Sequence, residues 1–88
     1  MKTPCVYMMA SERNGTIYTG VTSNLFQRAY QHRNKLVPGL TSRHGCTLLI
    51  WHEYYERMED AIAREKQIKA GSRRRKLELI EAMNPQWA

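Results

Sequence analysis

Two short segments that favour β-strands, residues 5–10 and 16–21, flank a run of turn-forming residues that contains Asn14-Gly15. Asn-Gly between two such segments is the strongest short-range signal for a β-hairpin, so the start of the chain is committed to antiparallel sheet. The hairpin can close through a two-residue turn at Asn14-Gly15 or through a four-residue loop at 12–15. In both cases the residue numbers of two opposing strand positions add up to an odd number. Tyr7 and Tyr18 then point to one face of the sheet. Taken alone, the two rings are expected to be half-buried and to stabilise the hairpin.

The rest of the chain predicts one more strand and three helices. These are a helix over roughly 24–34, a connector over 35–46, a strand over 47–53, a helix over roughly 57–70 and a helix from Ser72 to the residue before Asn84-Pro85. The strand is apolar enough to be central in a sheet, and a connector of this length in a small domain is often functional. The order β-β-α-β-α-α predicts an α+β fold, a three-stranded antiparallel sheet flanked by helices.

Length and charge limit what such a chain can do. The 88 residues suffice for one domain, residues 1–88, with a small core. The 14 Lys and Arg against 8 Asp and Glu give a formal net charge of +6, which is typical of a protein with a polyanionic partner, most often nucleic acid. No apolar run is long enough to cross a bilayer, and the first residues lack the apolar stretch of a signal peptide. We therefore expect a cytoplasmic protein with no membrane partner, and free thiols at Cys5 and Cys46.

Two polar side chains lie at the edge of the apolar face of the first predicted helix. Arg28 and His32 are four residues apart, so they share a helix face. The planar fork of an arginine can donate two hydrogen bonds at once to a phosphate. The alternative for Arg28 is a solvated guanidinium whose stem packs on the core.

Glu65 falls inside the inner face of the second predicted helix, which also carries Met58, Ala61, Ile62 and Ile68. An unpaired carboxylate in that position costs free energy. A divalent cation would relieve the cost, because Mg²⁺ is commonly held by one or two carboxylates together with water and substrate phosphate. A salt bridge to Arg28 or Lys69 is the alternative.

A run of cations without any acid follows Glu65. Its members are Lys66, Lys69, Arg73, Arg74, Arg75 and Lys76. Cations in the first turn of a helix oppose its macrodipole, so the three arginines bring no stability there. The arrangement favours contact with phosphates, with a solvated basic turn as the alternative. Gly20, at the end of the second strand, indicates close approach by another group or a bulge.

The order of these signals resembles the GIY-YIG nuclease domain, in particular its small stand-alone members. Cys5-Val6-Tyr7 and Tyr18-Thr19-Gly20 correspond to the two motifs that name the family, and residues 20–32 to the helix that follows. Residues 61–69 resemble the family's glutamate helix, and residues 79–87, with their Asn-Pro-x-Trp ending, resemble the end of the short members. The resemblance covers nearly the whole chain.

This resemblance implies a three-stranded antiparallel sheet flanked by helices, and cleavage of a DNA phosphodiester with one Mg²⁺ or Mn²⁺ ion. It assigns roles as follows: Tyr7 is the general base, Tyr18 positions the water or the phosphate, Arg28 stabilises charge on the phosphate, His32 assists, and Glu65 is the sole protein ligand of the metal. Gly20, Asn84 and the six cations would contact nucleic acid.

The chain departs from the family pattern in ways that bear on activity. Cys5 and Val6 replace Gly and Ile, which suits a strand equally well. Val21 stands where many active members carry a lysine, which predicts weak catalysis. Without a separate DNA-binding domain we expect low sequence specificity, unless a protein partner supplies it. The expected substrate is branched or single-stranded DNA, and RNA is not excluded. The expected setting is DNA repair. The alternative function is a non-catalytic module that binds nucleic acid or recruits proteins.

Overall fold

The computed structural model describes residues 3–34 and 45–87. Its elements follow the predicted order and are β1 (Cys5–Ala10), β2 (Ile17–Thr22), α1 (Leu25–Arg33), β3 (Leu48–Tyr54), α3 (Met58–Ala70) and α4 (Arg73–Met83). Each bound lies on the predicted position or next to it. Most of the predicted connector over 35–46 falls outside the described residues.

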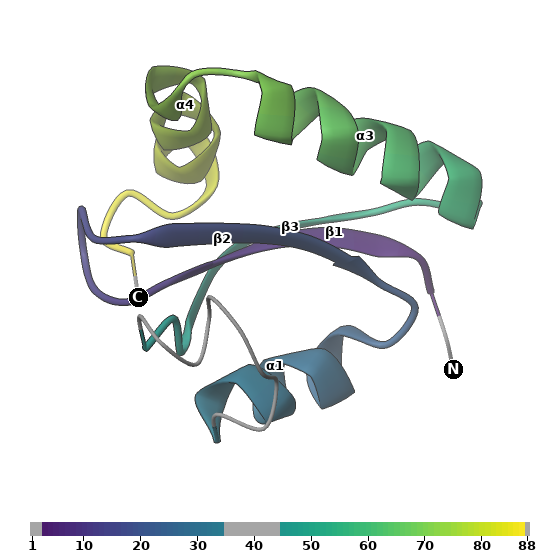
Figure 1. Ribbon diagram of the computed structural model, residues 1–88, viewed down its shortest axis with the longest axis horizontal. Helices are drawn as coiled ribbons and strands as arrows, with labels where there is room; N and C mark the ends of the chain where they lie inside the picture. The colour runs from purple at the N-terminus through teal and green to yellow at the C-terminus, as the bar shows by residue number, and fades with distance from the viewer. Residues whose placement is uncertain (1–2, 35–44, 88) are drawn as a thin grey trace.

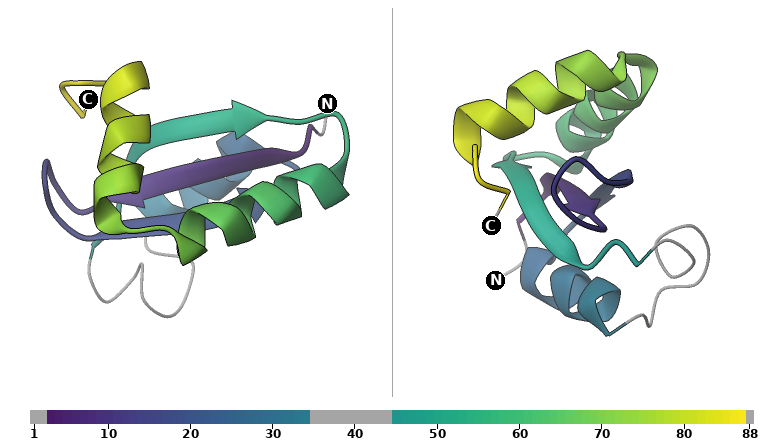
Figure 2. Two further views of the ribbon diagram at one scale, coloured as in Figure 1. Left: turned by 90° about the horizontal axis from the view of Figure 1, so that it is seen from above. Right: turned by 90° about the vertical axis from the view of Figure 1, so that its left-hand side faces the viewer.

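The three strands form one antiparallel sheet in the order β2-β1-β3. Helix α1 covers one face of this sheet, and α3 and α4 cover the other (Figure 1). Seen from above, α4 crosses the strands steeply, whereas α3 runs over the β2 side (Figure 2). Helix α3 accordingly contacts β2 and β1, and α4 contacts β3. The predicted α+β architecture is confirmed.

The expectation that the third strand is central was wrong, because β1 is the middle strand and β3 is an edge. All six residues of β1 are buried, whereas Leu48 and Tyr54 at the ends of β3 are exposed. The apolar run in β3 has another cause. The pairing shifts between Met8 and Met9, and this irregularity lets the consecutive residues Ile50 and Trp51 join the same core cluster.

The hairpin closes through the four-residue loop rather than the two-residue turn. Ser11 N donates to Thr16 O at 3.1 Å, and Gly15 N donates to Glu12 O at 2.9 Å. Asn14 takes the left-handed conformation, φ 61°, which asparagine tolerates better than most residues. The strand positions therefore sum to an odd number, as predicted.

Each face of the sheet packs its own hydrophobic cluster. The cluster beneath α3 and α4 contains Val6, Met8, Ala10, Ile50, Trp51, Ala61, Ile68, Ile80 and Trp87. The cluster on the α1 side contains Cys5, Tyr7, Met9, Leu25 and Cys46, and both cysteines are free, as predicted. Within the described ranges, no helix has the length and apolar character needed to span a bilayer.

The C-terminal segment folds back onto the sheet. Asn84 caps α4, and its Nδ2 donates to Ile50 O at 3.3 Å, while Trp87 N donates to Asn84 O at 3.0 Å. Trp87 is 3% exposed and keeps a left-handed backbone, φ 58°, which a bulky residue rarely adopts. The packing of its indole in the core holds this conformation in place.

We expect Trp87→Ala to lower the free energy of unfolding by about 3–5 kcal/mol, because it empties a buried site and leaves the backbone strain unrelieved. Urea denaturation followed by circular dichroism measures the change. Phe26→Ala is the control, since Phe26 is 85% exposed and should change stability by less than about 0.5 kcal/mol. Equal effects of the two substitutions would contradict the packing role of Trp87.

Candidate active site on the α1 face of the sheet

The sheet register places both hairpin tyrosines on the face covered by α1. Tyr7 lies opposite Gly20, and Met9 lies opposite Tyr18. Tyr7 belongs to the α1-side cluster and is 2% exposed, and the half-buried Tyr18 packs against this cluster. The prediction that the two phenols share a face is confirmed.

Gly20 makes room for the phenol of Tyr7. A Cβ atom at position 20 would lie 2.7 Å from Tyr7 Oη, 2.8 Å from Tyr7 Cζ and 2.9 Å from Tyr18 Cε2. These distances are too short for any side chain to be added without movement of the rings. The close approach predicted at this glycine is therefore the approach of Tyr7.

Helix α1 brings His32 to the two tyrosines. Asn24 caps the helix by accepting from Gln27 N at 3.2 Å, and His32 is 2% exposed in the last turn. Its Nε2 lies 2.9 Å from Tyr7 Oη, at hydrogen-bond distance. The ring centroid of His32 is 5.5 Å from that of Tyr7 and 5.3 Å from that of Tyr18. The three rings form one compact cluster, and Tyr7 and Tyr18 are 6.2 Å apart within it.

Burial sets the protonation of this cluster. It raises the pKa of Tyr7 well above its ordinary value, and Tyr18 adds to the rise, while the positive charge of Arg28 opposes it. Burial also lowers the pKa of His32, and Arg28 lowers it further. At neutral pH the phenol is therefore protonated and the imidazole is neutral, which is the pairing needed for a hydrogen bond from one to the other. Arg28 is half-buried and close enough to act on both groups.

Because the folded protein disfavours protonation of His32, the unfolded chain binds more protons below its ordinary pKa of 6.5. The free energy of unfolding should therefore be highest above pH 6.5 and fall as the pH is lowered toward the folded-state pKa. Urea titrations between about pH 7.5 and 5.5 test this prediction, since most carboxylates stay ionised in that window. His32→Leu should flatten the dependence. An equally steep dependence in that variant would assign the effect to other groups.

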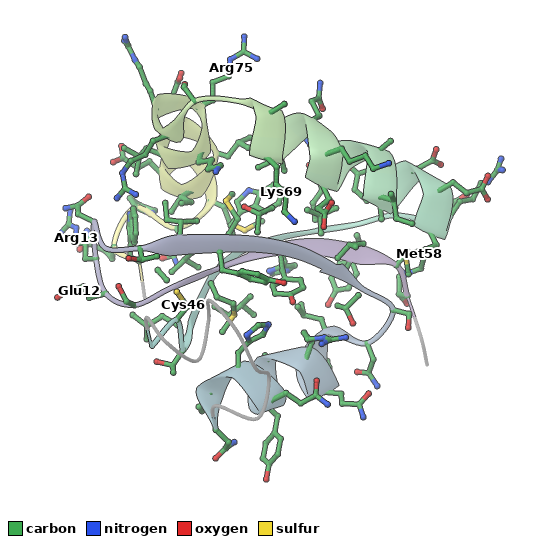
Figure 3. All side chains as sticks on the ribbon, viewed as in Figure 1. Glu12, Arg13, Cys46, Met58, Lys69 and Arg75 are labelled. Carbon is green, nitrogen blue, oxygen red and sulfur yellow. The ribbon has the colours of Figure 1, made fainter. Side chains whose placement is uncertain are left out.

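Glu65 lies on the other face of the sheet from this ring cluster. It belongs to α3, which packs on β2 and β1, whereas His32 lies on α1 and the tyrosines lie on the sheet face that α1 covers. Its Oε2 is 3.3 Å from Lys69 Nζ, so the salt bridge that the sequence offered as an alternative is present. Figure 3 shows Lys69 reaching from α3 toward the sheet. Among the described residues, no hydrogen bond or ion pair joins Glu65 to the ring cluster. Strand β2 is the edge strand beneath α3. A single substrate can therefore reach both Glu65 and the ring cluster only by passing around the free edge of β2.

Glu65 provides a single carboxylate, the smallest number of protein ligands with which Mg²⁺ is commonly held. Within 3–34 and 45–87, no three His, Cys, Asp or Glu side chains gather into a group that could hold a metal ion. A single carboxylate is nevertheless a known way to hold Mg²⁺, with water and phosphate at the other positions. The Glu65 side chain is 16% exposed and pairs with the Lys69 ammonium, so a cation there would compete with that ammonium for the carboxylate.

The basic run lies along α3 and the start of α4, and its members differ in their contacts. Arg73 Nη2 donates to Asn14 O at 3.0 Å and to Gly15 O at 2.9 Å, so its guanidinium holds the hairpin loop. Lys66, Arg74 and Arg75 are exposed, Lys76 is half-buried, and Lys69 pairs with Glu65. The nucleic-acid contacts assigned to these residues, to Gly20 and to Asn84 remain predictions. Asn84 also has a structural role, because its Nδ2 donates a hydrogen bond to Ile50 O on β3.

Sequence reasoning missed one polar network and misplaced one apolar residue. Tyr55 donates to Glu53 on β3, and Arg64 on α3 donates to the same carboxylate at 3.1 Å. This network fixes α3 over the sheet, and its only sequence signal was a carboxylate at the end of a strand. Ile62, predicted on the inner face of α3, is 38% exposed.

Comparison with known proteins identifies the family of this chain. A family model described as the GIY-YIG catalytic domain matches residues 3–78, which is most of the chain. The chain belongs to the GIY-YIG family. The match includes both motif tyrosines, α1 and the whole glutamate helix α3.

Several UPF0213 proteins align over most of this GIY-YIG chain. A UPF0213 protein of Clostridium perfringens is 34% identical over 70 residues, which are 80% of this chain and 75% of the relative. A UPF0213 protein of Staphylococcus saprophyticus is 31% identical over 68 residues, 77% of this chain and 83% of the relative. The solution structure of a UPF0213 protein from Bacillus halodurans matches with a TM-score of 0.58 at 26% identity, covering 93% of this chain and 86% of that one.

Proposed function

We propose that this GIY-YIG protein is a metal-dependent endonuclease that hydrolyses phosphodiester bonds in DNA. Membership of a family named for its catalytic domain supports nuclease chemistry. The observation that carries the proposal is the 2.9 Å contact between Tyr7 Oη and His32 Nε2, formed in a buried cluster beside Arg28. A phenol and an imidazole in contact, with a guanidinium whose charge acts on both, can supply proton transfer and charge stabilisation.

Tyr7 acts as the general base through His32. Because the raised pKa keeps Tyr7 protonated, it cannot take a proton from water unless it gives one up. His32 is neutral and at hydrogen-bond distance, so its Nε2 can accept the phenol proton while Tyr7 Oη takes a proton from the attacking water. The two transfers together keep Tyr7 neutral throughout, at the cost of a transient imidazolium that burial and Arg28 disfavour.

The other residues orient the substrate. Tyr18 is less buried than Tyr7, and its hydroxyl positions the water or the phosphate. Arg28 binds the scissile phosphate and stabilises its developing charge with paired hydrogen bonds. Glu65 would hold one Mg²⁺ or Mn²⁺ ion, and such an ion would supply stabilisation of charge on the leaving oxygen.

The expected substrate is DNA with a branch, flap or single-stranded region, with RNA as a second possibility. The basic run binds phosphates without reading bases, which gives low sequence specificity. Val21 stands where many active members carry a lysine, so this chain lacks a cation that would lower the pKa of Tyr7. The intrinsic rate of DNA cleavage is therefore low. A DNA repair setting and a partner that supplies specificity are consistent with these features.

Incubation of the pure protein with supercoiled plasmid, branched DNA and RNA tests the activity, with Mg²⁺ or Mn²⁺ and with EDTA. We expect nicking or cleavage of DNA that EDTA abolishes. Binding without cleavage of any substrate would favour a non-catalytic nucleic-acid-binding or recruitment module. One observation supports that second function: Glu65 pairs with Lys69 and lies across the sheet from the phenols.

The salt dependence of DNA binding tests the basic run separately. Arg74→Gln and Arg75→Gln should each flatten the slope of log affinity against log salt by about 0.7 to 0.9, because each removes one phosphate contact. Arg73→Gln should change the slope less, since this guanidinium already binds the loop carbonyls. Fluorescence anisotropy with a labelled oligonucleotide gives the slopes. Unchanged slopes for Arg74 and Arg75 would place their side chains in solvent.

A further inference from the structure

The Lys69 ammonium lies against one of the two carboxylate oxygens of Glu65, the side chain proposed to hold the metal. The Lys69 Nζ to Glu65 Oε2 distance is 3.3 Å, and the Glu65 side chain is 16% exposed, against 50% for Lys69. A carboxylate this well covered has few open directions of approach. An ammonium and a divalent cation repel each other and compete for the same oxygens. A divalent cation at this carboxylate therefore competes with the ammonium, and its affinity rises when the ammonium leaves Oε2.

The surroundings provide a second partner for that ammonium. Lys69 is the more exposed member of the pair, so its flexible stem can swing outward without unpacking α3. It lies in a run of cations that contains no acid between Glu65 and Glu78. In the free protein, Lys69 pairs with Glu65, the acidic residue that directly precedes this run. Nucleic-acid phosphates at this surface would offer the ammonium another partner.

We propose that Lys69 keeps Glu65 closed to a divalent cation until substrate phosphates draw the lysine away. The proposal rests on the proposed metal-binding role of Glu65 and adds a function for its helical neighbour. Metal and nucleic acid then bind cooperatively, since each favours the state in which Lys69 has left the carboxylate. The coupling is reciprocal, and couplings of this kind are commonly about 5- to 150-fold.

Binding of Mn²⁺ in the absence of nucleic acid gives the first test. Lys69→Met should raise the affinity for Mn²⁺ about 10-fold or more, measured by the electron paramagnetic resonance signal of the free ion. Mn²⁺ should then broaden the amide resonances around Glu65. Lys66→Met is the matched control: it removes the same charge from the same helix at an exposed position without a partner among the described side chains. Lys69→Arg should restore the weak affinity.

A branched DNA oligonucleotide gives the second test, in a Tyr7→Phe background that prevents cleavage. Mn²⁺ affinity should rise with DNA when Lys69 is present and stay level in Lys69→Met, after subtraction of Mn²⁺ bound by DNA alone. Equal Mn²⁺ affinities for Lys69→Met, Lys66→Met and the unchanged protein, with broadening at Glu65, would overturn the role of Lys69 and leave the metal site standing. Absence of broadening around Glu65 in every variant, with or without DNA, would overturn both.

Discussion

Replacement of Glu65 by glutamine is expected to lower the rate of DNA cleavage at least about 1,000-fold, which corresponds to about 4 kcal/mol in the activation barrier. The amide keeps the size of the carboxylate but cannot hold a divalent cation by charge. Because the basic run and the ring cluster are untouched, DNA affinity should stay the same or rise slightly, as one negative charge is lost. Plasmid nicking and anisotropy measure the two quantities on the same preparations.

Glu59→Gln provides the control for Glu65→Gln. Glu59 undergoes the same chemical change on the same helix, but it is exposed and pairs only with Arg57 in the described part of the chain. Its cleavage rate should remain near that of the unchanged protein. If Glu65→Gln cleaved DNA at a comparable rate, the carboxylate would not be the metal ligand, and the nuclease assignment would lose its metal site.

Replacement of Gly20 by alanine is expected to slow cleavage about 100- to 10,000-fold, the range associated with loss of a general base. The new Cβ would stand 2.7 Å from Tyr7 Oη, so the phenol must leave its place. Movement of the phenol breaks the 2.9 Å contact with His32 Nε2, and because Tyr7 is 2% exposed the ring has to move against its buried surroundings. Overpacking of this kind should also cost about 1–3 kcal/mol of folding free energy.

Two comparisons separate this effect from general damage. Gly71→Ala is the control, because the nearest atom to its new Cβ is 3.4 Å away, an ordinary contact. The double variant Gly20→Ala with Tyr7→Phe should be about as slow as Tyr7→Phe alone, because both changes remove the same phenol from the reaction. Fully additive losses would show that Gly20 acts through something other than Tyr7.

The site was only partly predictable from the sequence. Register arithmetic placed Tyr7 and Tyr18 on one face, because the side-chain period of a strand is fixed at two. The contact between Tyr7 and His32 spans 25 positions in the chain and depends on how α1 docks on the sheet, which local patterns do not state. Likewise, the buried helical position of Glu65 was visible in the sequence, but either Lys69 or a metal could have satisfied it.

The helices and strands, with their bounds to within one residue, were predictable from local sequence signals. Asn14 at the hairpin, the Asn24 and Ser72 caps and the stop before Pro85 act through bonds and sterics within a few residues, so they are legible without a structure. Only the tertiary structure decided that β1 is the central strand and that α1 and α3 cover opposite faces, which separates Glu65 from the phenols by an edge strand. The strand order and the placement of the helices depend on which apolar surfaces pack against each other. That packing involves segments far apart in the chain, so no local sequence pattern encodes it.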